Sequence, residues 1–279
     1  MNIGPSVDRA VGECHPPYMS RKPFHPRKHP SGSKRSNEPV RLYGLHPVTF
    51  ALRNERRRIH RVLLTPNARD RIDAKLLANV DAIEANVRSL DRLVGADAVH
   101  QGVIAEVEPL AVVALSDMQP TDLVLVLDQV TDPHNVGAIL RSAVAMNAGA
   151  VVVTQRNAPP ETGVLAKSAS GALELIDLVR VGNLANAIET LKRRGYSVIG
   201  LDSEGARDMA DAMPSGPLAI VLGAEGRGLR PRTREVVDVL ARIDVPGPIK
   251  SLNVSNAAVL SLFLARHKLD DPIPAAKVD

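Results

Sequence analysis

The chain has 279 residues, of which 44% are hydrophobic, and this suffices to bury the core of one large domain or of two ordinary ones. No stretch has the roughly 20 consecutive apolar residues of a membrane span, and the N-terminus lacks the pattern of a secretory signal, so we expect a cytoplasmic protein. The single cysteine, Cys14, excludes a disulfide framework and a thiolate zinc site, and an aromatic content of 2% argues against base stacking on an aromatic platform.

The net charge of +4 is concentrated at the N-terminus. Residues 1–41 contain eight Lys and Arg against three Asp and Glu, so the rest of the chain has 27 basic and 28 acidic side chains, or −1. The same segment contains seven prolines and cannot bury enough apolar surface to fold alone. We expect residues 1–38 to be a disordered basic tail, which is either a solvated extension, with Met19 as an alternative start, or an arm that tethers RNA.

The first ordered region is predicted to be a small α/β unit at residues 39–108. Pro47 fits the first turn of a helix, and residues 61–65 and 102–107 have the apolar content of strands. A helical pattern covers residues 74–85, and a shorter element follows at residues 87–94. A connector follows at residues 109–121. Five arginines on and after the first helix could contact phosphates, although a charge run is often only a solvated face: Arg53, Arg56, Arg57, Arg58 and Arg61.

From residue 122 onward, apolar runs alternate with helical patterns. The runs cover residues 123–127, 150–154, 176–181, 196–201, 218–222 and 241–245. Because these runs are continuous rather than alternating, both faces of each strand should be covered. The sequence therefore predicts an α/β fold with a parallel sheet flanked by helices at residues 122–279.

Polar side chains follow the ends of three of these strands, where open α/β sheets place their ligands. In the first segment, residues 127–143, Asn135 lies near the start of a helix and Arg141 on it. Six positions on a helix leave two side chains on different faces, so both can serve one site only if Asn135 lies in the preceding loop or cap. Otherwise Asn135 is an ordinary cap and Arg141 a solvated residue.

The other two segments have equally ordinary explanations when taken alone. In residues 221–229 a glycine turn carries Glu225, which could be a solvated carboxylate, and its glycine spacing does not match a dinucleotide fingerprint. In residues 243–258 a Pro/Gly turn leads to Ser251 and Asn253, which could simply cap the next helix. That helix is apolar around its circumference, so it must be buried within the domain or across a subunit interface.

Taken together, the three segments resemble in order and spacing the motifs of the SpoU family of S-adenosylmethionine-dependent RNA ribose methyltransferases. Residues 167–174 resemble the family's segment between its first and second motifs. Residues 43–48 and 100–105 resemble the ends of the small substrate-binding domain found in members that modify large-subunit ribosomal RNA or transfer RNA. The resemblance implies a trefoil knot in residues 122–279, which composition cannot show.

The resemblance also implies a reaction, in which a methyl group passes from S-adenosylmethionine to a ribose 2′-hydroxyl of structured RNA. A guanosine of ribosomal RNA is preferred over transfer RNA, and a homodimer without a metal is expected. Catalysis is assigned to Arg141, Asn135, Glu225, Ser251 and Asn253, and the cofactor's adenosine to backbone groups near Gly223, Val245 and Leu252. The turn before Ser251 is shorter than is usual in the family, which affects the rim of the cofactor site.

The resemblance gives Arg141 the task of helping to deprotonate the ribose, yet an arginine normally keeps its proton at neutral pH. Two roles stay open: a base in a desolvated, cationic surrounding, or a guanidinium that grips phosphate. His46 and His134 are alternative bases, although a capping or turn role is more frequent for such residues. Two other classes of protein also remain, a non-catalytic RNA-binding or ribosome-assembly factor with this fold and a Rossmann oxidoreductase, which needs the missing dinucleotide fingerprint.

Overall fold

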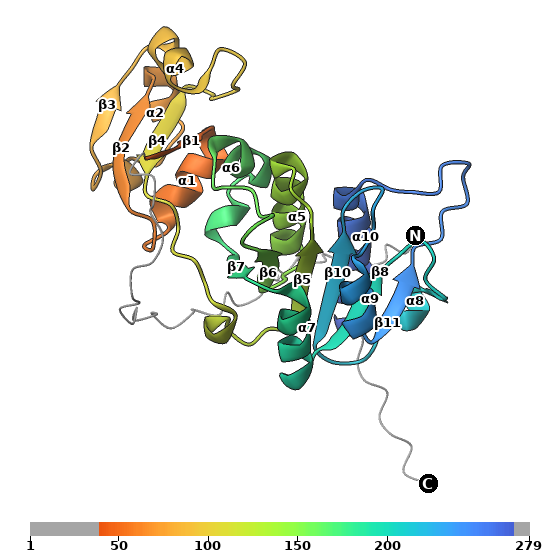
Figure 1. Ribbon diagram of the computed structural model, residues 1–279. Coiled ribbons are helices and arrows are strands. Elements are labelled where there is room, and N and C mark those ends of the chain that lie inside the picture. Colours follow the sequence, from red (N-terminus) through yellow and green to blue (C-terminus); the bar gives the residue numbers. More distant parts are fainter. Residues whose placement is uncertain (1–38, 271–279) are drawn as a thin grey trace, which may run out of the picture. The chain divides into compact units, whose positions relative to one another are not determined.

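The computed structural model describes residues 39–270, so the predicted tail at residues 1–38, with Cys14 and Met19, lies outside the described residues (Figure 1). The N-terminal α/β unit has a four-stranded sheet of order β1-β4-β2-β3, in which β4 is antiparallel to both neighbours and β3 is parallel to β2. Its elements are β1 (Val40–Tyr43), α1 (Leu45–Arg53), β2 (Ile59–Leu64), α2 (Pro66–Arg69), α3 (Ala74–Leu77), β3 (Ala82–Glu84), α4 (Val87–Val94) and β4 (Val103–Val107).

The long helix expected at residues 74–85 is wrong. The structure has only the short helix α3, and residues 82–84 form the edge strand β3 instead. Val62, Leu63 and Leu64 of β2 offer an open edge there, and β3 pairs with them in parallel. Long-range pairing therefore overrides a local helical pattern, a common reason why such predictions fail.

The C-terminal α/β unit, residues 123–270, has seven strands in the order β7-β6-β5-β10-β8-β11-β9, all parallel. Its strands are β5 (Leu123–Asp128), β6 (Ala150–Thr154), β7 (Asp177–Val181), β8 (Ser197–Leu201), β9 (Arg207–Asp208), β10 (Leu218–Gly223) and β11 (Val239–Arg242). Its α-helices are α5 (Pro133–Ala145), α6 (Gly163–Ala169), α7 (Leu184–Arg193), α8 (Met209–Ala212), α9 (Pro231–Val236) and α10 (Val254–Asp270). There are also two 3-10 turns in the described part of the chain: η1 (Leu115–Asp117) lies between β4 and β5, and η2 (Ala172–Glu174) lies between α6 and β7.

Both faces of the second sheet are covered, as predicted. Leu123, Leu125 and Leu127 of β5 are buried in the cluster that includes the inner faces of α5, α6 and α10. Val124 and Val126, which alternate with them, are buried in a second cluster with α7 and α9. This alternation explains the continuous apolar run, because neither face of the strand meets water.

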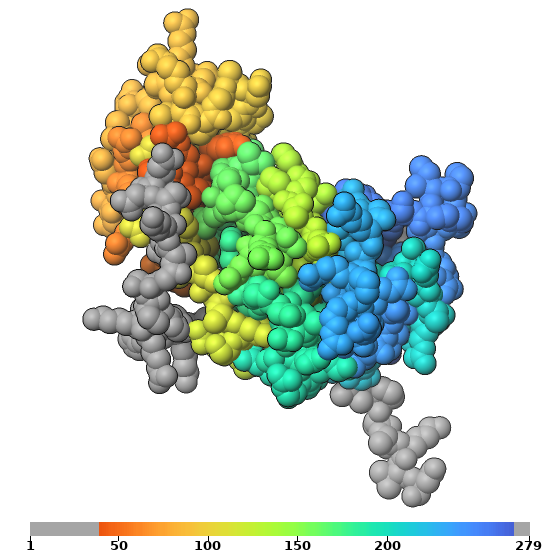
Figure 2. Space-filling model, viewed as in Figure 1, coloured from red at the N-terminus to blue at the C-terminus, as the bar shows by residue number. Residues whose placement is uncertain are grey.

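The last strand begins and ends earlier than expected. Sequence patterning placed it at residues 241–245, whereas β11 pairs with β8 from Val239 and ends at Arg242. Residues 243–253 form a loop instead, in which Pro246 and Pro248 have no N–H to donate to a strand ladder. This blue segment projects from the body of the protein between β11 and α10 (Figure 2).

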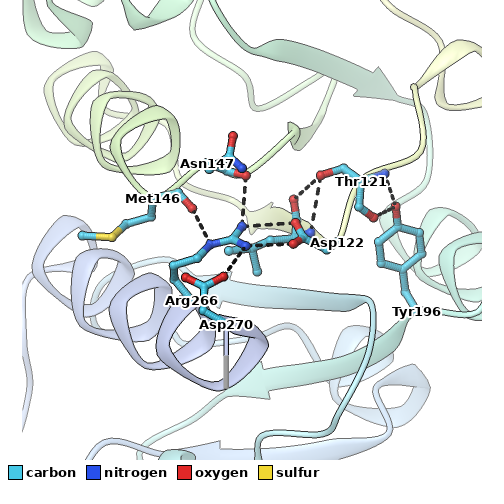
Figure 3. Close-up of polar contacts among 8 residues, drawn as sticks. Thr121, Asp122, Met146, Asn147, Tyr196, Arg266 and Asp270 are labelled. Carbon is cyan, nitrogen blue, oxygen red and sulfur yellow. Dashed lines mark hydrogen bonds and ion pairs between the residues drawn. The ribbon is translucent and has the colours of Figure 1, made fainter. Parts of the chain in front are cut away.

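A charged network holds the C-terminal helix to the sheet. The Arg266 guanidinium donates to Asp122 at 2.8 and 3.1 Å and to the carbonyl oxygens of Met146 and Asn147 at 3.1 Å each (Figure 3). The hydrogen bond to Asp122, opposed by burial, raises the pKa of Arg266 above its ordinary value. α10 is thereby tied to the start of β5 and the end of α5. No helix among residues 39–270 is both long and apolar enough to cross a membrane.

Candidate active site

The three segments singled out by sequence meet at the carboxyl ends of β5, β10 and β11. β5 and β10 are neighbours in the sheet, so the loops that follow them leave from the same edge. α5 follows the first loop, and α10 follows the third and packs against α5. The parallel topology therefore brings residues about a hundred positions apart in the sequence into one region.

The centre of this region is the Glu225 cluster, made of Asn135, Glu225, Asn253 and the N–H of Val254. Glu225 Oε1 accepts from Asn253 Nδ2 at 2.6 Å, from the Val254 N–H at 3.1 Å and from Asn135 Nδ2 at 3.4 Å. Asn253 Nδ2 also donates to Asn135 Oδ1 at 3.1 Å. The carboxylate sits at the N-terminus of α10, where the unpaired helix N–H groups and the helix dipole favour a negative charge. One side chain from each of the three segments is thus brought together.

Asn253 has a second role that agrees with its ordinary interpretation. Its Oδ1 accepts from the Ser255 N–H at 2.8 Å, so it caps α10. Asp132, not Asn135, caps α5, and it accepts from the His134 and Asn135 N–H groups at 3.3 and 3.1 Å. Asn135 is therefore the third residue of α5 rather than part of the preceding loop.

Arg141 and Ser251 have no hydrogen bond with the Glu225 cluster in the described part of the chain. Arg141 lies six residues after Asn135 on the same helix, its side chain is exposed, and within residues 39–270 it forms no hydrogen bond or ion pair. Ser251 is exposed in the loop before α10 and is equally without a hydrogen bond in the described part of the chain. The condition under which Asn135 and Arg141 share one site in one chain is not met, because Asn135 is helical.

A buried carboxylate that sequence analysis missed supports the glycine turn. Asp128, the last residue of β5, is 0% exposed, and its oxygens accept from Arg230 Nε at 2.6 Å and from the Arg230 N–H at 3.0 Å. Arg230 ends the loop that carries Glu225, so Asp128 fixes that loop to the sheet. The available signal was an acidic residue directly after the continuous apolar run of β5.

The glycines of the turn are explained by its own geometry. A Cβ on Gly223 would lie 2.2 Å from the carbonyl carbon of Gly228, and the Gly228 N–H donates to the Ala224 carbonyl oxygen at 2.9 Å. Gly226 and Gly228 have φ values of 74° and 62°, in the left-handed region that favours glycine. The two ends of the turn that carries Glu225 are therefore in direct contact, which leaves no room for a side chain at Gly223. A contact between Gly223 and the cofactor stays a prediction.

The loop before α10 offers the groups that an adenosine needs. Within the described residues, no backbone hydrogen bond from residues 243–252 to another backbone group is formed, and only the Val245 carbonyl accepts, from Lys250 Nζ at 3.0 Å. Val245 and Leu252 are half-buried, and a Cβ added to Gly247 would meet open space. Unused backbone donors and acceptors beside apolar side chains suit a neutral purine, so the residues present fit S-adenosylmethionine.

The predicted RNA-binding arginines mostly have acidic partners. Arg56 pairs with Asp177 at 3.2 Å, Arg58 with Glu108 at 3.4 Å and Arg61 with Glu106 at 2.8 Å, while Arg53 lies 5.8 Å from the centre of the Phe50 ring. The hydrogen bond from Arg61, together with Arg41 and against the effect of burial, lowers the pKa of Glu106. RNA contacts by these four arginines stay predictions.

For Arg57 the structure corrects the prediction. Its side chain is 0% exposed and pairs with Glu161 and Glu174 of the C-terminal unit. A guanidinium with no exposed surface and two carboxylate partners is not available to a phosphate. The run of arginines could not show this, because the partners lie more than a hundred residues away in the sequence.

The two histidines considered as bases lie elsewhere. His46 is the second residue of α1 and its Nδ1 lies 3.5 Å from Ser170 Oγ, whereas His134 is the second residue of α5 and its Nδ1 lies 3.2 Å from Ser168 Oγ. Neither side chain has a hydrogen bond to the Glu225 cluster among the described residues. In residues 39–270, no three His, Cys, Asp or Glu side chains gather as a metal site would require.

Comparisons with known proteins agree on one family. The family model described as the SpoU rRNA Methylase family matches residues 122–263, and that described as RNA 2′-O ribose methyltransferase substrate binding matches residues 41–113. A 23S rRNA (guanosine-2′-O-)-methyltransferase of Ralstonia nicotianae is 41% identical over 234 residues, which cover 80% of this chain and 94% of the relative. The corresponding protein of Pseudomonas putida is 39% identical, covering 81% of this chain and 95% of the relative.

A solved structure gives the same result at the level of the fold. The SpoU methyltransferase AviRb of Streptomyces viridochromogenes, in complex with the cofactor AdoMet, matches with a TM-score of 0.70 and 25% identity. The match covers 82% of this chain and 90% of that protein. Both α/β units thus have counterparts in one solved chain.

Proposed function

The chain belongs to the SpoU rRNA methylase family, and from this premise we propose that it methylates the ribose 2′-hydroxyl of a guanosine in 23S ribosomal RNA. The observation in the structure that carries the proposal is the Glu225 cluster, which joins the three family segments beside a loop with unused backbone groups. The curated relatives act on large-subunit rRNA, which favours this substrate over transfer RNA. A cytoplasmic site of action is proposed with it.

S-adenosylmethionine supplies a methyl group that its sulfonium already activates, so the protein must orient the ribose and help the hydroxyl lose its proton. The methyl group would go to the ribose O2′, and the hydroxyl proton would leave to a base such as Arg141 or to water. Backbone groups near Gly223, Val245 and Leu252 are the proposed cofactor contacts. Glu225 holds their loop to α5 and α10, and the N-terminal unit binds the RNA.

We propose that Arg141 takes part in catalysis once RNA or a second subunit covers its side chain. Its side chain is exposed in a single chain, whereas a base role requires a desolvated surrounding. Bound RNA or a second subunit would have to supply that surrounding. The alternative role, a grip on phosphate, needs no such change because a free guanidinium already suits it.

Methyl transfer and cofactor binding test the proposed function directly. We expect the purified protein to bind S-adenosylmethionine in calorimetry with a chelator present, and ribose-methylation mapping of 23S rRNA to lose one guanosine signal when the gene is deleted. Catalytic activity separates this proposal from a non-catalytic assembly factor. Binding of RNA without binding of S-adenosylmethionine would contradict it, and a lost signal in transfer RNA alone would replace the substrate.

We further propose a homodimer formed through α10. Leu260 and Phe263 on its outer face are 43% and 57% exposed, and the Phe263 ring is stacked on His267 at 6.4 Å between ring centres. The sequence predicted a helix too apolar to leave in water, and the inner side of α10 accounts for only part of that character. An exposed apolar strip on one face suits a second copy of the same strip across a two-fold axis.

Light scattering at micromolar concentration should therefore give twice the mass of the chain. Phe263→Asp should raise the dissociation constant by about 10- to 100-fold, the equivalent of the 1.5–3 kcal/mol gained by burying such a side chain. Val99→Asp, at an apolar residue of the N-terminal unit that is 67% exposed, is the matched control and should leave the dimer intact. A monomeric wild-type protein would rule the dimer out.

A further inference from the structure

A buried ion cluster joins the N-terminal and C-terminal α/β units. The Arg57 guanidinium donates to Glu174 Oε2 at 3.1 Å, and it also pairs with Glu174 Oε1 and with Glu161. The side chains of Arg57, Glu161 and Glu174 are 0%, 10% and 2% exposed. These three residues, called the Arg57 cluster below, place one cation between two anions away from water.

Backbone and amide groups complete the Arg57 cluster. Arg57 Nη1 donates to the Glu108 carbonyl oxygen at 2.9 Å, Asn54 Nδ2 donates to Glu174 Oε2 at 2.7 Å, and the Leu110 N–H donates to Glu161 Oε2 at 2.9 Å. Glu108 directly follows β4, and Leu110 lies in the connector between the two sheets. The cluster therefore joins the first unit, the connector and the second unit at one point.

Burial alone would disfavour the charge of Arg57. The hydrogen bond with Glu174 and the charges of Glu161 and Glu174 outweigh burial, so the pKa of Arg57 is raised. A buried ion cluster adds little to stability compared with well-packed apolar side chains, because desolvation offsets the attraction. Such ion pairs do restrict how their elements are oriented, because a guanidinium forms bidentate hydrogen bonds with a carboxylate in only one relative orientation.

The segment from α6 to η2 packs closely against the N-terminal unit. A Cβ on Gly163 would lie 2.4 Å from the Arg41 carbonyl oxygen, and one on Gly171 would lie 2.2 Å from the Phe50 ring. Glu174 ends this segment, which overlaps the stretch that sequence analysis noted at residues 167–174. Apolar residues of both units also form one contiguous buried cluster. Packing at this seam thus brings the two units together beside the Arg57 cluster.

We propose that Arg57 is a positioning residue for methyl transfer. Through Glu161 and Glu174 it locks the RNA-binding unit onto the methyltransferase unit, so that RNA held by the first presents its ribose to the second in one orientation. This inference rests on the proposed function for the reaction, but the lock itself rests only on contacts between the units. Arg57 contacts no group of the Glu225 cluster and acts at a distance from the reacting atoms.

Arg57→Met tests the lock because it keeps the length of the side chain and removes the charge. We expect the rate at saturating RNA to fall by about 10- to 100-fold, since a misplacement of about 1 Å can cost that much. The RNA concentration for half-maximal rate and the affinity for S-adenosylmethionine should change little. Arg88→Met, at an exposed arginine of α4 in the same unit that is not among the predicted RNA contacts, should retain the full rate.

A distance measurement tests the lock without using activity. Spin labels at Val99→Cys and Asn186→Cys, on exposed positions of the two units and in a Cys14→Ser background, report their separation by pulsed electron resonance. A large excess of unlabelled protein restricts the signal to distances within one chain. The distribution should be narrow in the protein with native Arg57 and in Arg88→Met, and broad or multimodal in Arg57→Met and in Glu174→Gln.

The possible outcomes test the role of Arg57 in holding the two units separately from the proposed methyltransferase function. A narrow distribution and an unchanged rate in Arg57→Met would overturn the proposal. A rate loss matched by an equal loss of S-adenosylmethionine affinity would also overturn it, because that points to general loss of structure. If Arg57→Met does not fold, the methyl-transfer rate and the distance distribution are measured in Arg57→Lys and Glu174→Gln instead. A wild-type protein without methyltransferase activity contradicts the proposed function but leaves the distance result to decide on the lock.

Discussion

Replacing Glu225 by alanine is expected to weaken S-adenosylmethionine binding by about 100-fold, the equivalent of about 3 kcal/mol. Glu225 Oε1 accepts three hydrogen bonds that tie the start of α10 to α5. The loop at residues 243–252, which carries the proposed cofactor contacts, ends at this point. Without the carboxylate, the loop loses its anchor and the cofactor must order it on binding, which lowers its affinity.

Two variants make the Glu225 test specific. Glu225→Gln keeps an oxygen that can accept the same three hydrogen bonds but removes the charge, so it should weaken binding by about 10-fold at most, as expected for loss of charge assistance. Glu235→Ala removes an exposed carboxylate on α9 that pairs with Arg232 and should have no effect. Calorimetry measures all three. Unchanged cofactor affinity with a collapsed rate in Glu225→Ala would instead place the carboxylate at the ribose.

The sheet of the C-terminal unit could be predicted from the sequence because its strands are buried on both faces. Five apolar runs correspond to β5, β6, β7, β8 and β10 within a residue or two. Prediction failed at one end of the sheet, where β11 is shifted and the short edge strand β9, at Arg207, has no apolar run at all. A strand as short as β9 is fixed by its neighbour rather than by its own composition.

The candidate site was predicted only in part, and for a comparable reason. Motif spacing placed Asn135, Glu225 and Asn253 in segments that the topology then brought together. Asp128 was missed because its role depends on a partner 102 residues away. Arg57 was misassigned because a basic run looks the same whether its charges face solvent or buried carboxylates. The trefoil knot rested on the resemblance alone, since threading leaves no periodic trace in a sequence.

The role of Arg141 depends more on a bound partner, RNA or a second subunit, than the role of any other predicted site residue. It is exposed and unpaired within residues 39–270, and it lies on α5, the helix that packs against α10. The proposed dimer face is on α10, so a second subunit would approach the same layer of helices. This arrangement is the reason to test Arg141 with RNA bound and at protein concentrations where the dimer is formed.

Arg141→Ala should lower the single-turnover rate by about 10²- to 10⁴-fold, the range expected for a lost general base, with little change in RNA or cofactor affinity. Arg141→Lys separates the two roles, because lysine keeps a cation, loses the planar fork and gives up its proton more readily. If Arg141 removes the proton, the lysine variant should retain some activity that rises with pH. If the guanidinium only grips phosphate, both variants should weaken RNA binding, and saturating RNA should restore much of the rate. Arg156→Ala, at an arginine in the turn after β6, is the control for loss of a positive charge alone. Full activity of Arg141→Ala at saturating RNA would remove Arg141 from the catalytic residues, and the proton would then have to leave by way of water or of the RNA itself.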